Sequence, residues 1–278
     1  MDLINNEPVL RLACFAGVFG VMALWEIMAP RRRLGIAKST RWLSNLGLVA
    51  LNALVVRLLL PLGAASVALL AHEHGWGLFN NLALPAWLVV VISIIALDIV
   101  IYLQHVLFHA VPALWHLHMV HHTDLDFDVT TGVRFHTLEI LLSLGIKLAV
   151  VVLLGAPALA VLLFEVLLNA TSLFNHSNVR IPERFDGVLR WVVVTPDMHR
   201  VHHSILLRET NSNFGFNLPW WDRLFGTYRP QPAAGQESMT IGIEQFRDPR
   251  ELGLDRMLLQ PFRGDAGRYP AGERQVEQ

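Results

Sequence analysis

The histidines of this chain are concentrated in short motifs whose spacing suits metal binding. The sequence contains 13 histidines, and the pattern HxxHH occurs twice, at residues 118–122 and 199–203. A third pattern, HxxxH, places His105 and His109 one helical turn apart. Together these motifs give more imidazoles than one octahedral ion can use, so two ions are expected. The eight motif histidines are His105, His109, His118, His121, His122, His199, His202 and His203, and His136 and His176 are possible additions.

The residue types in these motifs also restrict the metal. Cys14 is the only cysteine and lies in an apolar run, so the sequence offers neither a thiolate site nor a disulfide framework. A structural zinc has a small tetrahedral shell that usually includes cysteine, which argues against a lone zinc. Two irons in a shell of imidazoles would keep open positions for oxygen. Spacing alone does not distinguish iron from zinc or manganese.

Acidic and phenolic side chains lie close to the histidine motifs in sequence. Asp98 and Tyr102 fall on the same helical stripe as the HxxxH pair, and an ionisable residue within an apolar span is functional by default. Carboxylates that hold the imidazole tautomers are expected among Asp98, Asp124, Glu139 and Asp197. We therefore take Asp98, Tyr102 and Glu139 as the candidate catalytic residues.

The elements that must position these residues are membrane-spanning helices. Of the 278 residues, 53% are hydrophobic and only 16% are charged, and a net charge of −1 excludes the basic footprint of a nucleic-acid-binding protein. Long apolar stretches occupy residues 9–29, 46–71, 84–108 and 138–174. The fourth is interrupted by Gly155, Ala156 and Pro157, which predicts two short spans or a re-entrant hairpin. Only an even number of crossings there would bring both HxxHH motifs to one side.

The positive charges indicate which side this is. A short loop after the first stretch carries five basic residues, which are Arg31, Arg32, Arg33, Lys38 and Arg41. Such loops stay in the cytoplasm under the positive-inside rule. The histidine-rich segment 110–137 should emerge on the same side.

Several ordered motifs together give the sequence a resemblance to a known family. They are His105-x3-His109, Leu114-Trp115 before His118-x2-His121-His122, Arg134-Phe135-His136-x2-Glu139, Asn175-His176-Ser177-Asn178, His199-x2-His202-His203, and Asn213-Phe214-Gly215 followed by Trp221-Asp222-Arg223-Leu224-Phe225-Gly226-Thr227. Over roughly residues 40–230 the chain resembles the fatty acid hydroxylase and sterol desaturase superfamily of integral-membrane di-iron proteins.

This resemblance implies a membrane helix bundle with a cytoplasmic di-iron site that uses O2 to attack an unactivated C–H bond of a lipid. It implies the eight motif histidines as ligands, with His136 and His176 matching further histidines of the motif set. His116 stands where the family more often has another polar residue, and we leave it out. No dinucleotide, haem-attachment or iron–sulfur motif occurs in the sequence, so a separate reductase, ferredoxin or cytochrome is expected to supply electrons.

We therefore expect an all-α, multi-span transmembrane helix bundle with a cytoplasmic histidine-lined di-metal site. Residues 1–83 are expected to form N-terminal transmembrane helices, 84–230 the catalytic domain, and 231–278 a partly disordered cytoplasmic tail. The expected activity is oxygen-dependent hydroxylation or desaturation of a membrane lipid such as a fatty acyl chain or sterol, in a bacterial inner membrane. A histidine-rich metal transporter or metal-binding protein is the alternative, although ligands grouped at one membrane face disfavour transport. An inactive scaffold is a third possibility, which intact motifs disfavour.

Overall fold

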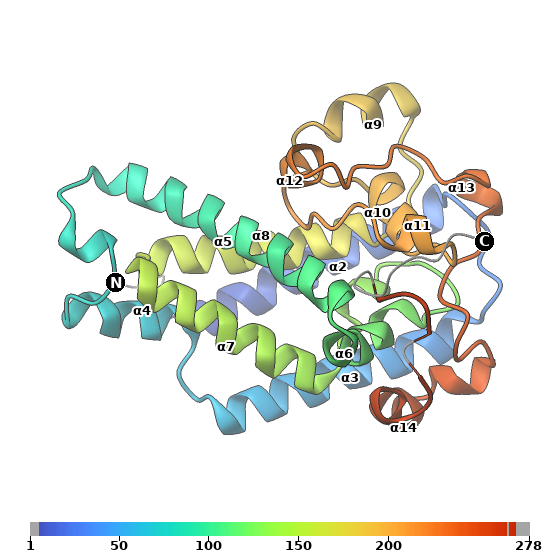
Figure 1. Cartoon of the computed structure of the whole chain (residues 1–278), viewed down its shortest axis with the longest axis horizontal. Coiled ribbons are helices and arrows are strands. Elements are labelled where there is room, and N and C mark those ends of the chain that lie inside the picture. Colours follow the sequence, from blue (N-terminus) through green and yellow to red (C-terminus); the bar gives the residue numbers. More distant parts are fainter. Residues whose placement is uncertain (1–5, 266, 271–278) are drawn as a thin grey trace.

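Long helices lie side by side in this protein, and shorter helices gather at one end of them (Figure 1). The structure is a computed structural model that describes residues 6–265 and 267–270. Within these residues, 5 segments are long and apolar enough to cross a membrane. They are α2 (Glu7–Met28), α3 (Lys38–Leu59) continued by α4 (Ala64–Glu73), α5 (Ala86–Ala110), α7 (Thr137–Leu154) and α8 (Ala158–Asn175). The described residues form helices and isolated bridges but no strand, which confirms the predicted all-α membrane bundle.

The interrupted apolar stretch folds as two helices, α7 and α8, and not as one. Gly155 ends α7 with a left-handed backbone, at a φ of 65°, and Pro157 caps the start of α8. A Cβ at Gly155 would also meet the backbone oxygen of Trp76 at 2.9 Å, so glycine is strongly favoured at this turn. α7 leads the chain away from the first HxxHH motif and α8 leads it back, so the second HxxHH motif lies at the same end of the bundle as the first.

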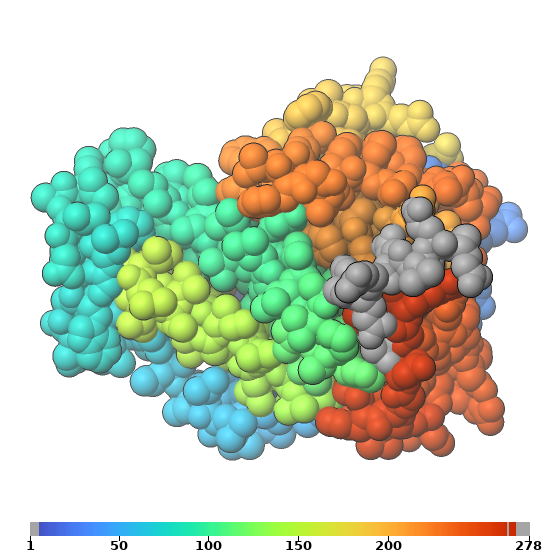
Figure 2. All heavy atoms as spheres, viewed as in Figure 1, coloured from blue at the N-terminus to red at the C-terminus, as the bar shows by residue number. Residues whose placement is uncertain are grey.

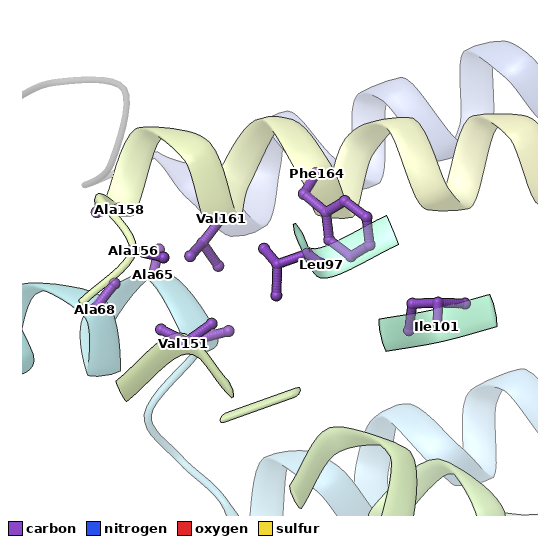
Figure 3. Packing of buried hydrophobic residues seen from close by; sticks show 10 residues of the cluster. Ala65, Ala68, Leu97, Ile101, Val151, Ala156, Ala158, Val161 and Phe164 are labelled. Carbon is purple, nitrogen blue, oxygen red and sulfur yellow. The ribbon is translucent and has the colours of Figure 1, made fainter. Parts of the chain in front are cut away.

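The spans pack through a core of small and branched side chains. Ala65 and Ala68 of α4 are fully buried and allow a close approach to Val161 of α8, while Leu97 of α5 fills the centre (Figure 3). The outward faces carry exposed leucines and valines, as expected where lipid is the solvent. The core thus joins a helix of the expected N-terminal domain, α4, to the helices of the expected catalytic domain.

The shorter helices that gather at one end of the spans form a unit that we call the cap. They are α6 (Pro112–His122), α9 (Glu183–Leu189), α10 (Pro196–His202), α11 (Leu207–Thr210), α12 (Trp220–Leu224), α13 (Gly235–Ser238) and α14 (Leu254–Leu259), with 3-10 turns η2 (Thr131–Val133), η3 (Pro249–Leu252) and η4 (Gln260–Phe262), while η1 (Phe79–Asn81) lies between α4 and α5. All the histidine motifs lie in the cap or at the helix ends that enter it.

The described part of the expected polar tail, which was expected to be partly disordered, packs on the cap. Met257 packs with Leu48 and Val120, and Tyr269 stacks on Trp115, so the tail supplies buried side chains to the cap. The end of the tail, for which disorder was expected, lies outside the described residues, as does residue 266. The apolar residues of the tail are too widely spaced to be recognised as core from their pattern alone.

Candidate metal centre

Nine of the ten histidines predicted as ligands form two adjacent groups. In each group, one ligand-capable atom per residue lies within 4.8 Å of the others, and all nine residues are buried. The first group contains His105, His109, His118, His122 and His202, and the second contains His121, His176, His199 and His203. The geometry therefore offers two metal positions side by side.

The helical period explains how each HxxHH motif serves both positions. In the first motif His118 and His122, four residues apart, face the first group, while His121 turns to the second. The second motif, on α10 and its C-cap, is arranged in the opposite sense, since His202 joins the first group. Adjacent histidines in each motif thus serve different positions.

Two spanning helices complete the groups at the end that enters the cap. The HxxxH pair on the last turns of α5 joins the first group, and His176, the residue after α8, joins the second. Pro112 begins α6 immediately after α5 and redirects the chain, so that the first HxxHH motif faces the α5 histidines. The proximity of the histidines on α5, on α6 and after α8 therefore depends on this turn and on the α7–α8 hairpin.

Hydrogen bonds on the outer ring nitrogen fix the tautomer of most of these histidines. Glu139 Oε1 lies 2.6 Å from His118 Nδ1 and accepts its proton. For five further histidines the acceptor is a backbone carbonyl or a side-chain amide oxygen. The further acceptors are Phe214 O for His105, Asn211 Oδ1 for His109, Arg134 O for His121, Ser172 O for His176 and Ser212 O for His202. A proton on Nδ1 leaves the lone pair of Nε2 free to face the centre.

These inward lone pairs meet one another at short range. His105 Nε2 lies 3.1 Å from His118 Nε2, and His176 Nε2 lies 3.1 Å from His121 Nε2. Two acceptor lone pairs at this distance repel, and His202 Nε2 and both ring nitrogens of His203 are buried without a hydrogen-bond partner. A cation between them would remove both costs, so the residues fit metal ions.

Burial favours the neutral, ligating form of the imidazoles. It lowers the pKa of the cap histidines well below the ordinary histidine value, and neighbouring histidines lower it further. This holds for His121, His122, His199, His202 and His203, and the pKa of His176 falls to about 3. These six candidate ligands therefore need no deprotonation at neutral pH.

His136 is the predicted ligand that the structure places elsewhere. Its Nδ1 accepts a hydrogen bond from the backbone N–H of Leu138, which caps the start of α7, and its Nε2 lies 3.3 Å from the carbonyl of Leu258. Both nitrogens are thus used away from the two groups, and we correct its role to helix capping. His116, which was left out of the ligands, also lies outside both groups.

The three candidate catalytic residues lie in different surroundings. Of these, only Glu139 contacts a histidine of the groups, so it is a positioning residue for His118. Asp98 accepts a hydrogen bond from Trp221 Nε1 at 2.7 Å, and the Tyr102 hydroxyl lies 2.9 Å from Thr227 Oγ1. Asp98 thus holds α12 against α5, Tyr102 holds the residues that follow α12, and neither belongs to the two histidine groups. Asp124 and Asp197, expected beside imidazoles, pair with arginines instead.

Two structural supports of the site were not identified from the sequence. Arg41 is fully buried and donates to both carboxylate oxygens of Asp124 and to Asp128, which fixes the loop after the first HxxHH motif. Burial alone would raise the pKa of Asp124, but the Arg41 guanidinium lowers it to about 2. The acidic spacing of residues 124, 126 and 128 was the available signal for this loop.

The second support is Asp222 in the closing motif. Its carboxylate accepts from the backbone N–H groups of Phe214 and Gly215 and from Thr227 Oγ1. It thereby shapes the loop that presents the Phe214 carbonyl to His105. Burial raises the pKa of Asp222 to about 6.

Comparisons with known proteins agree with this site. Residues 90–227 match the family described as fatty acid hydroxylase. The chain is 31% identical over 207 residues to an ornithine lipid hydroxylase of Rhizobium tropici, covering 73% of this chain and 58% of that protein. It is 26% identical over 226 residues to an alkylglycerol monooxygenase of Xenopus tropicalis, covering 77% and 47%. For the Homo sapiens alkylglycerol monooxygenase the identity is 25% over 209 residues, covering 72% and 44%. The chain thus spans about half the length of the curated relatives it matches, and no solved structure matches it.

Proposed function

Because the chain belongs to the fatty acid hydroxylase family, we propose that it hydroxylates a C–H bond of a membrane lipid with O2 at a di-iron centre. The observation that carries this proposal is the pair of adjacent, buried, all-histidine groups at one end of the membrane spans. The names of the relatives favour hydroxylation over desaturation and a polar lipid as substrate.

The numbers of ligands support two ions with open positions. Five histidines would hold one iron and four the other, so six-coordinate ions would keep places for oxygen. When bound, two ferrous ions would supply the activation of oxygen that an unactivated C–H bond requires. Glu139 would hold His118 with its Nε2 toward the first ion and raise the basicity of that ligand.

Aromatic side chains give the centre an apolar side that faces the membrane core. The Phe216 ring lies 5.3 Å from that of His105 and 5.9 Å from that of His199, and Phe216 also packs on the core cluster of the spans. Phe135 stacks on His121 with ring centroids 4.4 Å apart. An acyl or alkyl chain that enters from the lipid would reach the metal positions past Phe216.

The reaction also requires a partner protein. One oxygen atom enters the lipid, and the electrons and protons that reduce the other atom to water must come from a donor. The motifs of flavin, haem and iron–sulfur proteins are not found in the sequence, so a separate reductase, ferredoxin or cytochrome is proposed. We place the centre on the cytoplasmic side of a bacterial inner membrane, because the basic loop that contains Arg31 packs against the same cap.

Metal content per chain is the measurement that tests the proposal first. Protein purified in mild detergent from iron-supplied cells should contain about two irons per chain, as two ligand groups require. With a reductase and O2, it should add one oxygen atom from 18O2 to a lipid in a bacterial lipid extract, detected by mass spectrometry. The variant His202→Ala is the matched control and should give no labelled lipid.

The alternative function, metal transport, makes a different prediction. A transporter must release its ions, whereas all nine histidines here are buried with at most 3% of their surface exposed. Metal uptake by vesicles that contain the protein, with no 18O-labelled lipid under any donor, would favour transport and contradict the oxygenase.

A further inference from the structure

An apolar outer face on α9 and α12 lies beside the membrane-spanning helix α5. Its large side chains point away from the protein, and two of them, Val188 and Leu224, are each 69% exposed. We call this surface the α9–α12 face. Its exposed residues are Phe185, Val188, Trp191, Val192, Trp220, Leu224 and Phe225. So much exposed apolar surface in one place is uncommon on a water-facing domain.

The contacts of α12 place this face at the depth of the span and not beyond its end. Asp98 is the middle residue of α5, which has 25 residues, and Trp221 donates to it at 2.7 Å. One turn further on, Tyr102 stacks with Phe225 at a centroid distance of 5.4 Å. A helix of this length rises about 37 Å, and the hydrocarbon core is about 30 Å thick. The part of α5 around Asp98 and Tyr102 therefore falls within the thickness of the hydrocarbon core. Figure 2 shows the orange segment that contains α12 against the green-blue atoms of α5.

Three charged residues of this region, Asp186, Arg190 and Arg223, are turned away from the apolar face. Asp186 and Arg190 are buried and pair with each other, and Arg190 also donates to the carbonyl of Pro230. The Arg223 guanidinium lies 3.9 Å from the centroid of the Trp191 ring and donates to the Arg190 carbonyl. This arrangement keeps charge out of an apolar solvent.

Exposed charge remains only at the start of α9 within this helix. Glu183 and Arg184 are exposed there, and the Arg184 guanidinium lies 4.7 Å from the centroid of the Phe185 ring, at the edge of the face. The nearby N–H of Arg180 donates to the carbonyl of Ala29, the residue after the first span. The polar end of α9 is therefore level with the end of a span, while its apolar end approaches α12. Such a gradient is typical of a helix at the boundary between headgroups and acyl chains.

We propose that the α9–α12 face lies in the lipid bilayer, in the leaflet nearer to the histidine groups and continuous with the lipid-facing side of α5. Its indole rings suit this depth, since Trp220 and Trp191 combine a large apolar body with a polar N–H. The cap is then partly immersed in the membrane and does not stand clear of it in water. This proposal does not depend on the reaction that the metal centre performs.

Spin labels on this face can measure its surroundings directly. Val188→Cys and Leu224→Cys are made in a Cys14→Ser background, labelled, and reconstituted in phospholipid vesicles. Collision rates with oxygen, which is concentrated in lipid, are compared with those of a water-soluble nickel chelate. Leu103→Cys on the exposed side of α5 serves as the lipid reference, and Arg250→Cys in the exposed part of the tail as the water reference.

We expect the oxygen-to-nickel ratio at positions 188 and 224 to be close to that at 103 and several-fold higher than at 250. A ratio like that at 250 would place the face in water and overturn the proposal. Low accessibility to both reagents would also overturn it, because a second copy or another protein would then cover the face. Unchanged metal content in each labelled variant verifies the fold.

Discussion

At the residue scale, the metal centre depends on how adjacent histidines divide between two positions. In each HxxHH motif the residues four apart share one group and the residue between them belongs to the other. The sequence was sufficient to predict eight of these nine histidines from their spacing, because imidazoles one helical turn apart have few other uses in a buried helix, and it offered the lone His176 only as a possible addition. It could not separate His136 from them, since its capping role depends on the backbone of α7.

Replacing a ligand in each group should affect the two positions separately. His121→Ala removes a ligand of the second group and His202→Ala one of the first, so each should lose roughly one of about two metals per chain. His136→Ala should keep full metal content, because His136 only caps a helix. Metal analysis of the three purified proteins checks this, and equal metal content in all three would contradict the assignment.

The carboxylate behind His118 should matter without being a ligand itself. Glu139→Gln keeps the size of the side chain but removes the charge that accepts from His118 Nδ1, so metal affinity should fall about 10–100-fold. Competition with a chelator measures this change. The control is His118→Ala, which removes the ligand and should be more severe. A Glu139→Gln protein with unchanged affinity would show that the hydrogen bond does not tune the site.

At the scale of elements, the membrane-spanning helices were predictable, but the long-range ion pairs that hold the cap together were not. Continuous apolar runs and the Gly155–Pro157 break identify α5, α7 and α8 because a bilayer allows few other structures. The pairing of Arg41 with Asp124 joins residues 83 positions apart, which no local pattern reveals. From the sequence, Arg41 was interpreted only as part of the basic loop that indicates the cytoplasmic side, whereas its side chain is buried in the cap.

Removing Arg41 should destabilise the whole cap. Arg41→Met leaves Asp124 and Asp128 buried without their cation, which costs about 3–5 kcal/mol. Thermal unfolding in detergent should show a lower midpoint, whereas Arg250→Met should leave it unchanged because the pair with Asp248 is exposed. Since the pKa of Asp124 is lowered to about 2, its stabilisation is complete above about pH 4 and decreases as the pH falls toward 2. Equal midpoints for both variants would argue against a structural role for the network.

The aromatic side chain between the core and the metal centre should control access of the substrate. Phe216→Trp adds volume where a lipid chain would pass, so lipid hydroxylation should fall at least about tenfold while metal content stays the same. Product formation with a reductase and 18O2 measures the first effect. Phe262→Trp, a change at an exposed ring, is the control. Full activity in Phe216→Trp would mean that the lipid enters by another route.

At the scale of the whole molecule, the bundle places every functional element at one end. The end of α2, the start of α3, the ends of α5 and α8 and the tail all meet there (Figure 1). Apolar runs and an even number of crossings were enough to predict this common end. The packing of Met257 and Tyr269 onto the cap was not predictable, because a polar segment with scattered apolar residues has no distinctive period.

The charge distribution predicts which side of the membrane this end occupies. The loop at residues 29–37 carries three consecutive arginines, whereas the loops at the opposite end, residues 60–63, 74–85 and 155–157, contain no lysine or arginine. In a Cys14→Ser background, Arg33→Cys and Arg250→Cys should therefore react with an impermeant thiol reagent only from the cytoplasmic side, and Glu73→Cys only from the other. All three positions are exposed, so access depends on the side and not on burial. Labelling of 33 and 73 from one side would contradict the bundle, while labelling of 33 and 250 from outside would reverse the orientation and require an electron donor beyond the cytoplasm.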